Sequence, residues 1–169
     1  MLATFDRALV SANRWAVIAM LAAMATMVFA NVALRFLTDQ SILWVEEASR
    51  YLMIWLTFLG SGIVLRYGAH VAIETLAHGL PGAATAIRGA VLGVLFVFFA
   101  AMIWLGARYA ILTWDQTTPV LGIPIGAVYL AMPIGFALMM VHLALMAGGY
   151  VRSGRFLVAP EFGADSADP

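Results

Sequence analysis

The sequence contains no cysteine and no lysine. Without cysteine, the chain cannot form disulfides, thiolate metal sites, iron–sulfur clusters or a cysteine nucleophile. Charged residues are also scarce, since they make up 11% of the 169 residues whereas hydrophobic residues make up 64%. A soluble domain of this length carries far more charge, so the composition excludes a soluble protein and indicates an integral membrane protein.

Four long intervals of the chain are free of charge except near their ends. Each can supply a helix of about 20 residues, the length needed to cross roughly 30 Å of hydrocarbon. We therefore predict an all-α integral membrane fold with transmembrane helices at 14–37, 44–66, 87–113 and 124–150. Residues 1–160 are expected to form a single four-helix membrane domain, and the acidic tail at 161–169 is expected to be disordered.

The arginines supply every basic charge and predict the orientation in the membrane. They flank the start of the first span, the connection between the second and third spans, and the end of the fourth: Arg7, Arg14, Arg66, Arg88, Arg152 and Arg155. The other two connections contain acidic residues but no basic one. By the positive-inside rule, both termini and the second connection are expected to be cytoplasmic. Arg35 and Arg108 fall toward the opposite side and are the minority.

The connection at 67–81 has the pattern of an amphipathic helix. From residue 73, apolar residues recur at i, i+3, i+4 and i+7, while His70, Glu74 and His78 recur every four residues on another face. This periodicity predicts a helix that lies in the cytoplasmic interface, preceded by Arg66. Such a helix is either a connector that rests on lipid headgroups or a strut that packs against a partner subunit.

Residues 44–50 place three charges at the start of the second span. Glu46 and Glu47 stand four and three residues before Arg50, so either carboxylate can pair with the arginine along the helix. Both acids also lie near a helix N-terminus, which favours anions. We expect Glu47→Ala or Arg50→Ala to weaken assembly or transport, because either change leaves a charge without its partner at a poorly solvated position.

This pairing leaves one carboxylate over, and Arg35, Arg108 or a partner protein could neutralise it. The cluster therefore has three interpretations. It is an interfacial group that reaches water, with Trp44 as an anchor in the headgroup region. Alternatively it makes a polar contact within the helix bundle or to another subunit, or it binds a transported ion or substrate.

Four further residues are unusual in so apolar a chain. Asn31 either bridges two helices or caps backbone groups near the end of the first span. Pro124 suits the first turn of a helix, and Pro133 falls inside the fourth span, where it should kink the helix or free a carbonyl. Only His142 lies well within a span, so no histidine pair is available for a haem between helices. It is expected to be a hydrogen-bonded packing residue or a group near the membrane interface.

An ordered set of residues extends across nearly the whole chain, from Asn13 to about Val151. Its members are Asn31, Arg35, Trp44-Val45-Glu46-Glu47-Ala48-Ser49-Arg50, Trp55 to Gly60, Arg66, Gly68, His70-Val71-Ala72-Ile73, Leu80-Pro81, Thr117, Leu121, Ile123-Pro124, Tyr129 and Pro133-Ile134-Gly135. In this order they resemble the small permease subunit of tripartite ATP-independent periplasmic (TRAP) transporters, the DctQ type. Glu74 departs from the family pattern, which more often has aspartate there, but it keeps the charge.

The resemblance implies a function that the residues alone do not. In such transporters a periplasmic substrate-binding protein captures an organic acid and delivers it to a small and a large permease subunit in the bacterial inner membrane. An ion gradient, usually of sodium, drives uptake, and the large subunit carries the substrate and ion sites. The chain would then be a scaffold that braces the large subunit. It would not be an enzyme, and would hold no catalytic, metal or cofactor site and no nucleic acid.

Two other functions stay open from the residues. The helices could anchor an electron-transfer enzyme in the membrane, or the chain could be a free-standing small channel. The sequence shows no inverted repeat, no pair of broken half-helices and no row of acids at mid-membrane depth, which are the usual signs of a transport pathway. Charges concentrated near the ends of the spans favour a structural subunit over a pump.

Overall fold

The computed structural model describes residues 2–66 and 84–153, which form helices joined by short connections. The helices are α1 (Leu2–Thr38), α2 (Leu43–Arg66), α4 (Ala84–Leu112), α5 (Ile125–Tyr129) and α6 (Ala131–Ser153). The described ranges contain no strand, only an isolated bridge between Thr117 and Pro124. The predicted all-α fold is therefore confirmed.

Four helical segments are long and apolar enough to cross a membrane: Thr4–Thr38, Leu43–Arg66, Thr85–Leu112 and Ile125–Gly148. They confirm the prediction of four spans, and the chain is a multi-pass membrane protein. The predicted interfacial helix at 67–81, with His70 and Glu74, and the predicted disordered tail at 161–169 lie outside the described residues.

The first helix begins well before the predicted start of its span at residue 14. It contains neither glycine nor proline, the two residues least compatible with a helix interior, and it extends over 37 residues. At 1.5 Å per residue this is about 55 Å, so part of the helix continues beyond the hydrocarbon core. At its far end, Asp39 adopts a left-handed φ of 56°, which is a common way to end a helix.

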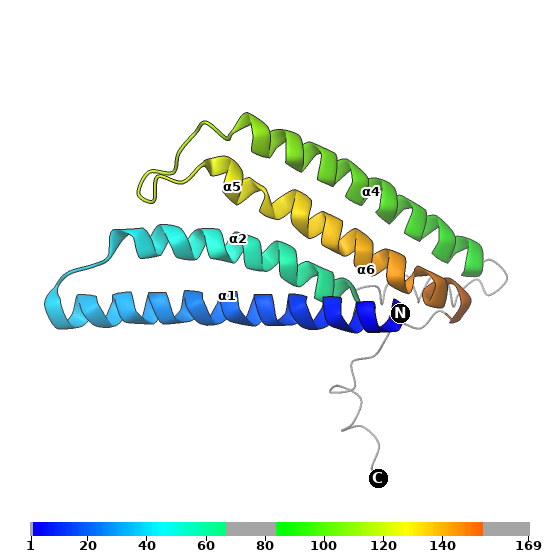
Figure 1. The fold of residues 1–169 in the computed structure, drawn as a ribbon, viewed down its shortest axis with the longest axis horizontal. Coiled ribbons are helices and arrows are strands. Elements are labelled where there is room, and N and C mark those ends of the chain that lie inside the picture. Colours follow the sequence, from blue (N-terminus) through cyan, green and yellow to red (C-terminus); the bar gives the residue numbers. More distant parts are fainter. Residues whose placement is uncertain (1, 67–83, 154–169) are drawn as a thin grey trace, which may run out of the picture.

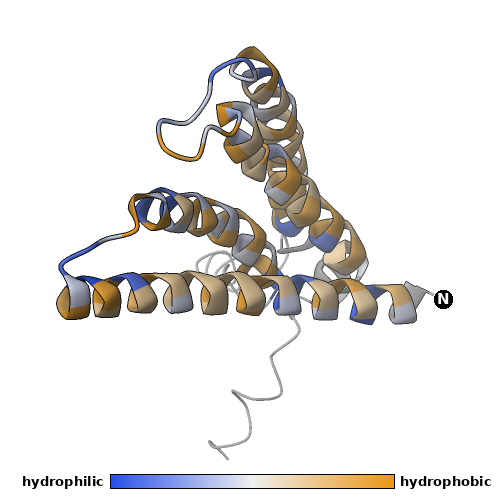
Figure 2. Ribbon diagram, turned by 60° about the vertical axis from the view of Figure 1, so that its left-hand side comes forward, coloured by the Kyte–Doolittle hydropathy of each residue, from blue (hydrophilic) through white to orange (hydrophobic). Residues whose placement is uncertain are grey.

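The helices lie side by side in the order α1, α2, α6, α4 (Figure 1). Each packs on the next, so α2 and α6 are central while α1 and α4 form the two edges. A turned view shows α4 and α6 rising away from the pair formed by α1 and α2 (Figure 2). Because α1 has one main neighbour, none of the most apolar window of its span is buried, compared with 33% for the fourth span.

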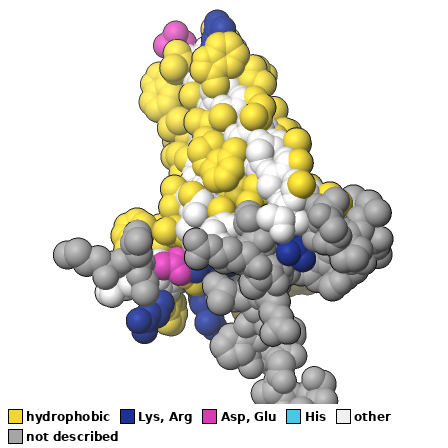
Figure 3. Space-filling view, turned by 90° about the vertical axis from the view of Figure 1, so that its right-hand side faces the viewer, with side chains coloured by type: hydrophobic (Ala, Val, Ile, Leu, Met, Phe, Trp, Pro, Cys, Tyr) yellow, Lys and Arg dark blue, Asp and Glu magenta, His cyan; other side chains and the backbone are white. Residues whose placement is uncertain are grey.

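The surface is as apolar as this open arrangement requires. Hydrophobic side chains predominate on the upper part of the face in Figure 3, and charged side chains lie at its upper tip and lower down, where the described part of the face ends. Large exposed hydrophobic residues include Phe29, Phe36, Val97 and Ile111. Such a surface is stable only against lipid or against the apolar surface of another membrane protein.

Aromatic side chains fill the junction of α2, α4 and α6. The ring of Phe136 on α6 lies 5.9 Å from that of Phe58 on α2, and 5.7 Å from those of Phe98 and Phe99 on α4. Rings at these separations gain from edge contacts as well as from close packing. The adjoining core is aliphatic and consists of Leu65, Leu92, Met139 and Leu143 together with Phe99.

Gly135 allows α6 to approach α2 closely. A Cβ atom at this position would lie 2.6 Å from Phe58 Cβ and 2.9 Å from Phe58 O. Small residues at contacts of this kind let membrane helices pack through their backbones.

We expect Gly135→Ala to lower the free energy of unfolding by about 1 to 3 kcal/mol, because α2 and α6 must move apart to accommodate the new methyl group. The midpoint of thermal denaturation in detergent measures the loss. Gly93→Ala is the matched control, since a Cβ there has no neighbour within 4 Å. Equal midpoints for the two variants would contradict the close approach.

Candidate functional site

Glu47 connects α2 to the loop at 113–124. Its side chain is buried, with the residue 6% exposed. One carboxylate oxygen accepts a hydrogen bond from the Tyr51 hydroxyl at 2.7 Å, and the other accepts from the backbone N–H groups of Val120 at 2.8 Å and Leu121 at 3.2 Å. Hydrogen bonds to an ionised acceptor are stronger than neutral ones, so this single carboxylate holds the loop on the start of the second span.

The loop is folded so that its N–H groups point at the carboxylate. Thr118 is buried and donates its N–H to the carbonyl of Ile123 at 2.9 Å, while its own carbonyl accepts from Gly122 N–H at 3.1 Å. Gly122 has a φ of +64°, which glycine adopts at little cost. A tight turn of this kind presents successive N–H groups to an anion, and Glu47 provides that anion.

The ion pairing expected within residues 44–50 does not form. Among the described residues, neither Glu46 nor Glu47 lies within ion-pair distance of Arg50. Glu46 and Arg50 are both exposed, as is Trp44. Glu47 instead uses backbone donors that come from more than 70 residues further along the chain. The expectation that one of the two acids pairs with Arg50 is wrong, because the loop supplies the hydrogen-bond donors for Glu47.

Arg108 was a candidate partner for the leftover carboxylate, and the structure places it elsewhere. Its guanidinium lies over the ring of Trp104, at 5.1 Å from the centroid, on the exposed side of α4. Both residues belong to one helix turn. A cation in this position is stabilised by the ring face at a modest energy.

Asn31 and Arg35 lie on α1 near the start of α2. Asn31 Oδ1 accepts the N–H of Ile42 at 2.7 Å, so it bridges α1 to the connection that leads into α2. Asn31, Arg35 and Glu46 also line a small pocket of about 140 Å³ between the two helices. Three residues that sequence reasoning singled out separately are thus brought together.

Two prolines shape the start of the fourth span. Pro124 is the residue that precedes α5. Pro133 follows the turn at Leu130 that separates α5 from α6, and it cannot donate a hydrogen bond to the carbonyl four residues earlier. Its ring packs near α4, where a Cβ on Gly106 would lie 2.9 Å from Pro133 Cδ. The predicted fourth span is therefore two helical segments in succession.

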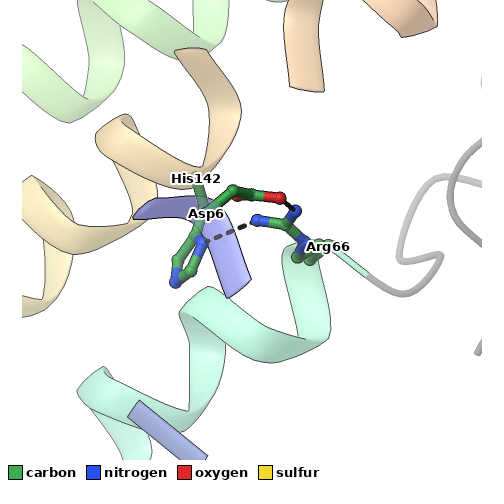
Figure 4. Close-up of polar contacts among 3 residues, drawn as sticks. All are labelled: Asp6, Arg66 and His142. Carbon is green, nitrogen blue, oxygen red and sulfur yellow. Dashed lines mark hydrogen bonds and ion pairs between the residues drawn. The ribbon is translucent and has the colours of Figure 1, made fainter. Parts of the chain in front are cut away.

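A buried polar cluster lies at the opposite end of the helices and joins three of them (Figure 4). Arg66 at the end of α2 forms an ion pair with Asp6 of α1, and its Nη1 lies 3.3 Å from His142 Nδ1 of α6. Arg66 is 4% exposed and His142 is fully buried. An arginine in this position must use its hydrogen bonds on other side chains, because water does not reach it.

Beside this cluster, Asn13 and Gly62 complete the contact between α1, α2 and α6. Asn13 Nδ2 donates to the carbonyl of Leu59 at 3.1 Å. Gly62 makes room for the imidazole, since a Cβ there would lie 3.1 Å from His142 Cδ2. The prediction that His142 is a packing residue with a hydrogen bond agrees with this geometry.

Sequence reasoning did not connect Asp6, Asn13 and Arg66 with His142. The ion pair joins residues 60 positions apart, and the histidine contact joins residues 76 positions apart. The available signal was the presence of the polar residues Asp6 and Asn13 in the first half of a mostly apolar helix, but nothing local identifies their partners. In the part of the chain that the structure describes, no group of three or more acidic, histidine or cysteine side chains is arranged to hold a metal.

Comparison with known proteins gives a consistent result. Residues 10–152 match the sequence model of the family described as "Tripartite ATP-independent periplasmic transporters, DctQ component". The chain is 34% identical over 115 residues to a putative TRAP transporter small permease protein of Haemophilus influenzae, a match that covers 68% of this chain and 71% of the relative.

Two further relatives differ in length from this chain. The ectoine TRAP transporter small permease protein TeaB of Halomonas elongata is 31% identical over 118 residues, covering 67% of this chain and 60% of the relative. The isethionate TRAP transporter permease protein DctMQ of Oleidesulfovibrio alaskensis is 30% identical over 141 residues, covering 75% of this chain and 22% of the relative. Both matches span less than two thirds of the relative's own length.

Proposed function

We propose a function from one premise: the chain belongs to the family of DctQ components of tripartite ATP-independent periplasmic transporters, and is a small permease subunit. In this proposal it is the scaffold that braces a large permease subunit during uptake of an organic acid. A sodium gradient, and not ATP, drives this uptake. A periplasmic binding protein delivers the substrate. The chain itself catalyses no reaction.

The observation that carries the scaffold role is the pair of buried polar contacts at the two ends of the helices. Glu47 holds α2 to the loop at 113–124, and the contacts of Arg66 hold α1, α2 and α6 together. Buried charged side chains lose their partners if the helices move, so these contacts favour one fixed arrangement of the helices. A subunit with such contacts at both ends suits a static support for a partner that moves.

The comparisons support the partner and the substrate class. The isethionate relative is a DctMQ fusion, and the match covers 22% of it. The remaining part of that chain is long enough to contain a large permease. The relatives are named for transporters of isethionate, ectoine and C4-dicarboxylates, and these names support an organic acid as the substrate. The positive-inside rule supports cytoplasmic termini, which would place the connections at 39–42 and 113–124 on the periplasmic side of a bacterial inner membrane.

Affinity purification of this chain from its native membrane in mild detergent tests the proposal. We expect a large permease to co-purify in roughly equal amount, and deletion of this chain to abolish uptake of the substrate by cells that retain the large permease. Co-purification with a flavoprotein or an iron–sulfur subunit would contradict the proposal in favour of an electron-transfer anchor. Flux through liposomes that contain this chain alone would instead support a channel.

A further inference from the structure

The pocket between α1 and the start of α2 combines opposite charges in a small volume. Its polar lining comes from Asn31 and Arg35 on α1, Ser41 in the connection, and Glu46 on α2. Its volume is about 140 Å³, and since one water molecule occupies roughly 30 Å³ of the liquid, it has space for a polar group of a few heavy atoms. A folded protein segment is too large for it.

The two charges in this pocket are not satisfied by each other. Within the described ranges, neither Arg35 nor Glu46 has an ion-pair partner within 4 Å, although both line the same pocket. Asn31 uses its Oδ1 to accept the N–H of Ile42, which leaves the Nδ2 group of the amide to donate. The pocket therefore offers a cation and an amide donor on one wall, and a carboxylate on the other.

The residues around the pocket are apolar and exposed, as expected for a surface that faces lipid. Val28, Val32 and Val45 supply its apolar lining. On the helix that carries the first two, Phe29, Phe36 and Leu37 are 76%, 86% and 83% exposed. Large exposed hydrophobic side chains beside a polar pocket near the end of a span are the arrangement found where headgroups meet acyl chains. A soluble partner protein would meet a more polar rim.

We propose that this pocket binds the headgroup of a zwitterionic phospholipid that carries a primary ammonium, of the phosphatidylethanolamine class. Arg35 and the Asn31 amide bind the phosphate, and Glu46 accepts hydrogen bonds from the ammonium. Val28 and Val32 contact the start of the acyl chains. A glycerol headgroup offers no cation to Glu46, and a choline headgroup has no N–H to donate and is larger. This ligand goes beyond the scaffold role and does not depend on the identity of the transported substrate.

Native mass spectrometry of the full chain tests the site. The protein is purified in mild detergent and equilibrated with equal amounts of phosphatidylethanolamine, phosphatidylcholine and phosphatidylglycerol that have identical acyl chains. We expect the wild type to retain phosphatidylethanolamine preferentially. Glu46→Gln keeps the side-chain shape and should lower the ratio of retained phosphatidylethanolamine to phosphatidylglycerol roughly three- to fivefold, since it removes one partly solvated ionic contact. Arg35→Gln should lower retention of all three lipids, which share the phosphate.

Arg108→Gln and Asp115→Asn are matched controls, because both residues are exposed at the same end of the helices but do not line the pocket. Both should leave the lipid ratios unchanged, and circular dichroism should show the same helix content in every variant. Equal retention of the three lipids by the wild type would overturn the proposal, as would unchanged ratios in Glu46→Gln. Loss of a co-purifying protein from Glu46→Gln with unchanged lipid ratios would also overturn it and assign the pocket to a protein contact.

Discussion

Replacement of Arg66 by alanine is expected to lower the free energy of unfolding by about 3 to 5 kcal/mol, the usual cost of removing one partner from a buried ion pair. Arg66 is 4% exposed, and the substitution leaves the Asp6 carboxylate without its partner. It also removes the contact with His142, so all three helices in the cluster lose a shared contact. Thermal denaturation of the detergent-solubilised protein, followed by tryptophan fluorescence, measures the change.

Arg50→Ala is the matched control, since it removes an arginine from the same helix at an exposed position. It should leave the denaturation midpoint nearly unchanged. In a double-mutant cycle, Asp6→Ala should lower the cost of Arg66→Ala, because the carboxylate that would be left unpaired is then absent. Equal midpoints for Arg66→Ala and Arg50→Ala would show that the cluster makes no net contribution to stability.

Replacement of Glu47 by alanine should release the loop at 113–124 from α2. Three hydrogen bonds are lost, and the N–H groups of Val120 and Leu121 are left without their acceptor. We expect the denaturation midpoint to fall by about 5 to 10 °C. Within the proposed complex, we expect less large permease to co-purify. Limited proteolysis should detect new cleavage in the loop, because its backbone is no longer held.

Comparison of Glu47→Ala with its neighbours separates the buried carboxylate from general charge effects. Glu46→Ala removes an exposed acid one residue before Glu47. Arg50→Ala removes the arginine that the spacing along the helix indicated as the partner of Glu47. Both should retain the wild-type midpoint and loop protection. Tyr51→Phe removes one of the three hydrogen bonds and should have an intermediate effect. If Arg50→Ala were as damaging as Glu47→Ala, pairing along the helix would be the correct interpretation after all.

The spans could be predicted because membrane insertion depends on local composition. A run without charge that is long enough to cross the hydrocarbon is sufficient to identify a helix, whatever its neighbours are. The ends of the helices could be predicted less well. The first helix begins at Leu2, well before its predicted start, and a turn at Leu130 divides a span that was predicted to be one continuous helix. Helices continue or break according to capping and packing as well as hydropathy.

The candidate site was predicted only in part. The charged residues at 44–50, Asn31 and Arg35 were recognisable because polar groups are costly in an apolar helix and therefore need a reason. Their partners were not recognisable. Spacing along one helix indicated Arg50 for Glu47, whereas the structure uses backbone groups of Val120 and Leu121.

The amino-acid sequence by itself determined that this protein lies in the membrane, that it crosses it four times and where charge is concentrated, because each of these follows from short stretches of residues and the cost of placing them in lipid. Only the tertiary structure decided that the helices lie in the order α1, α2, α6, α4, and that Arg66 therefore meets both Asp6 and His142. Those contacts depend on the rotation and close approach of helices distant in sequence, such as α6 against α2 at Gly135, and no local pattern encodes them.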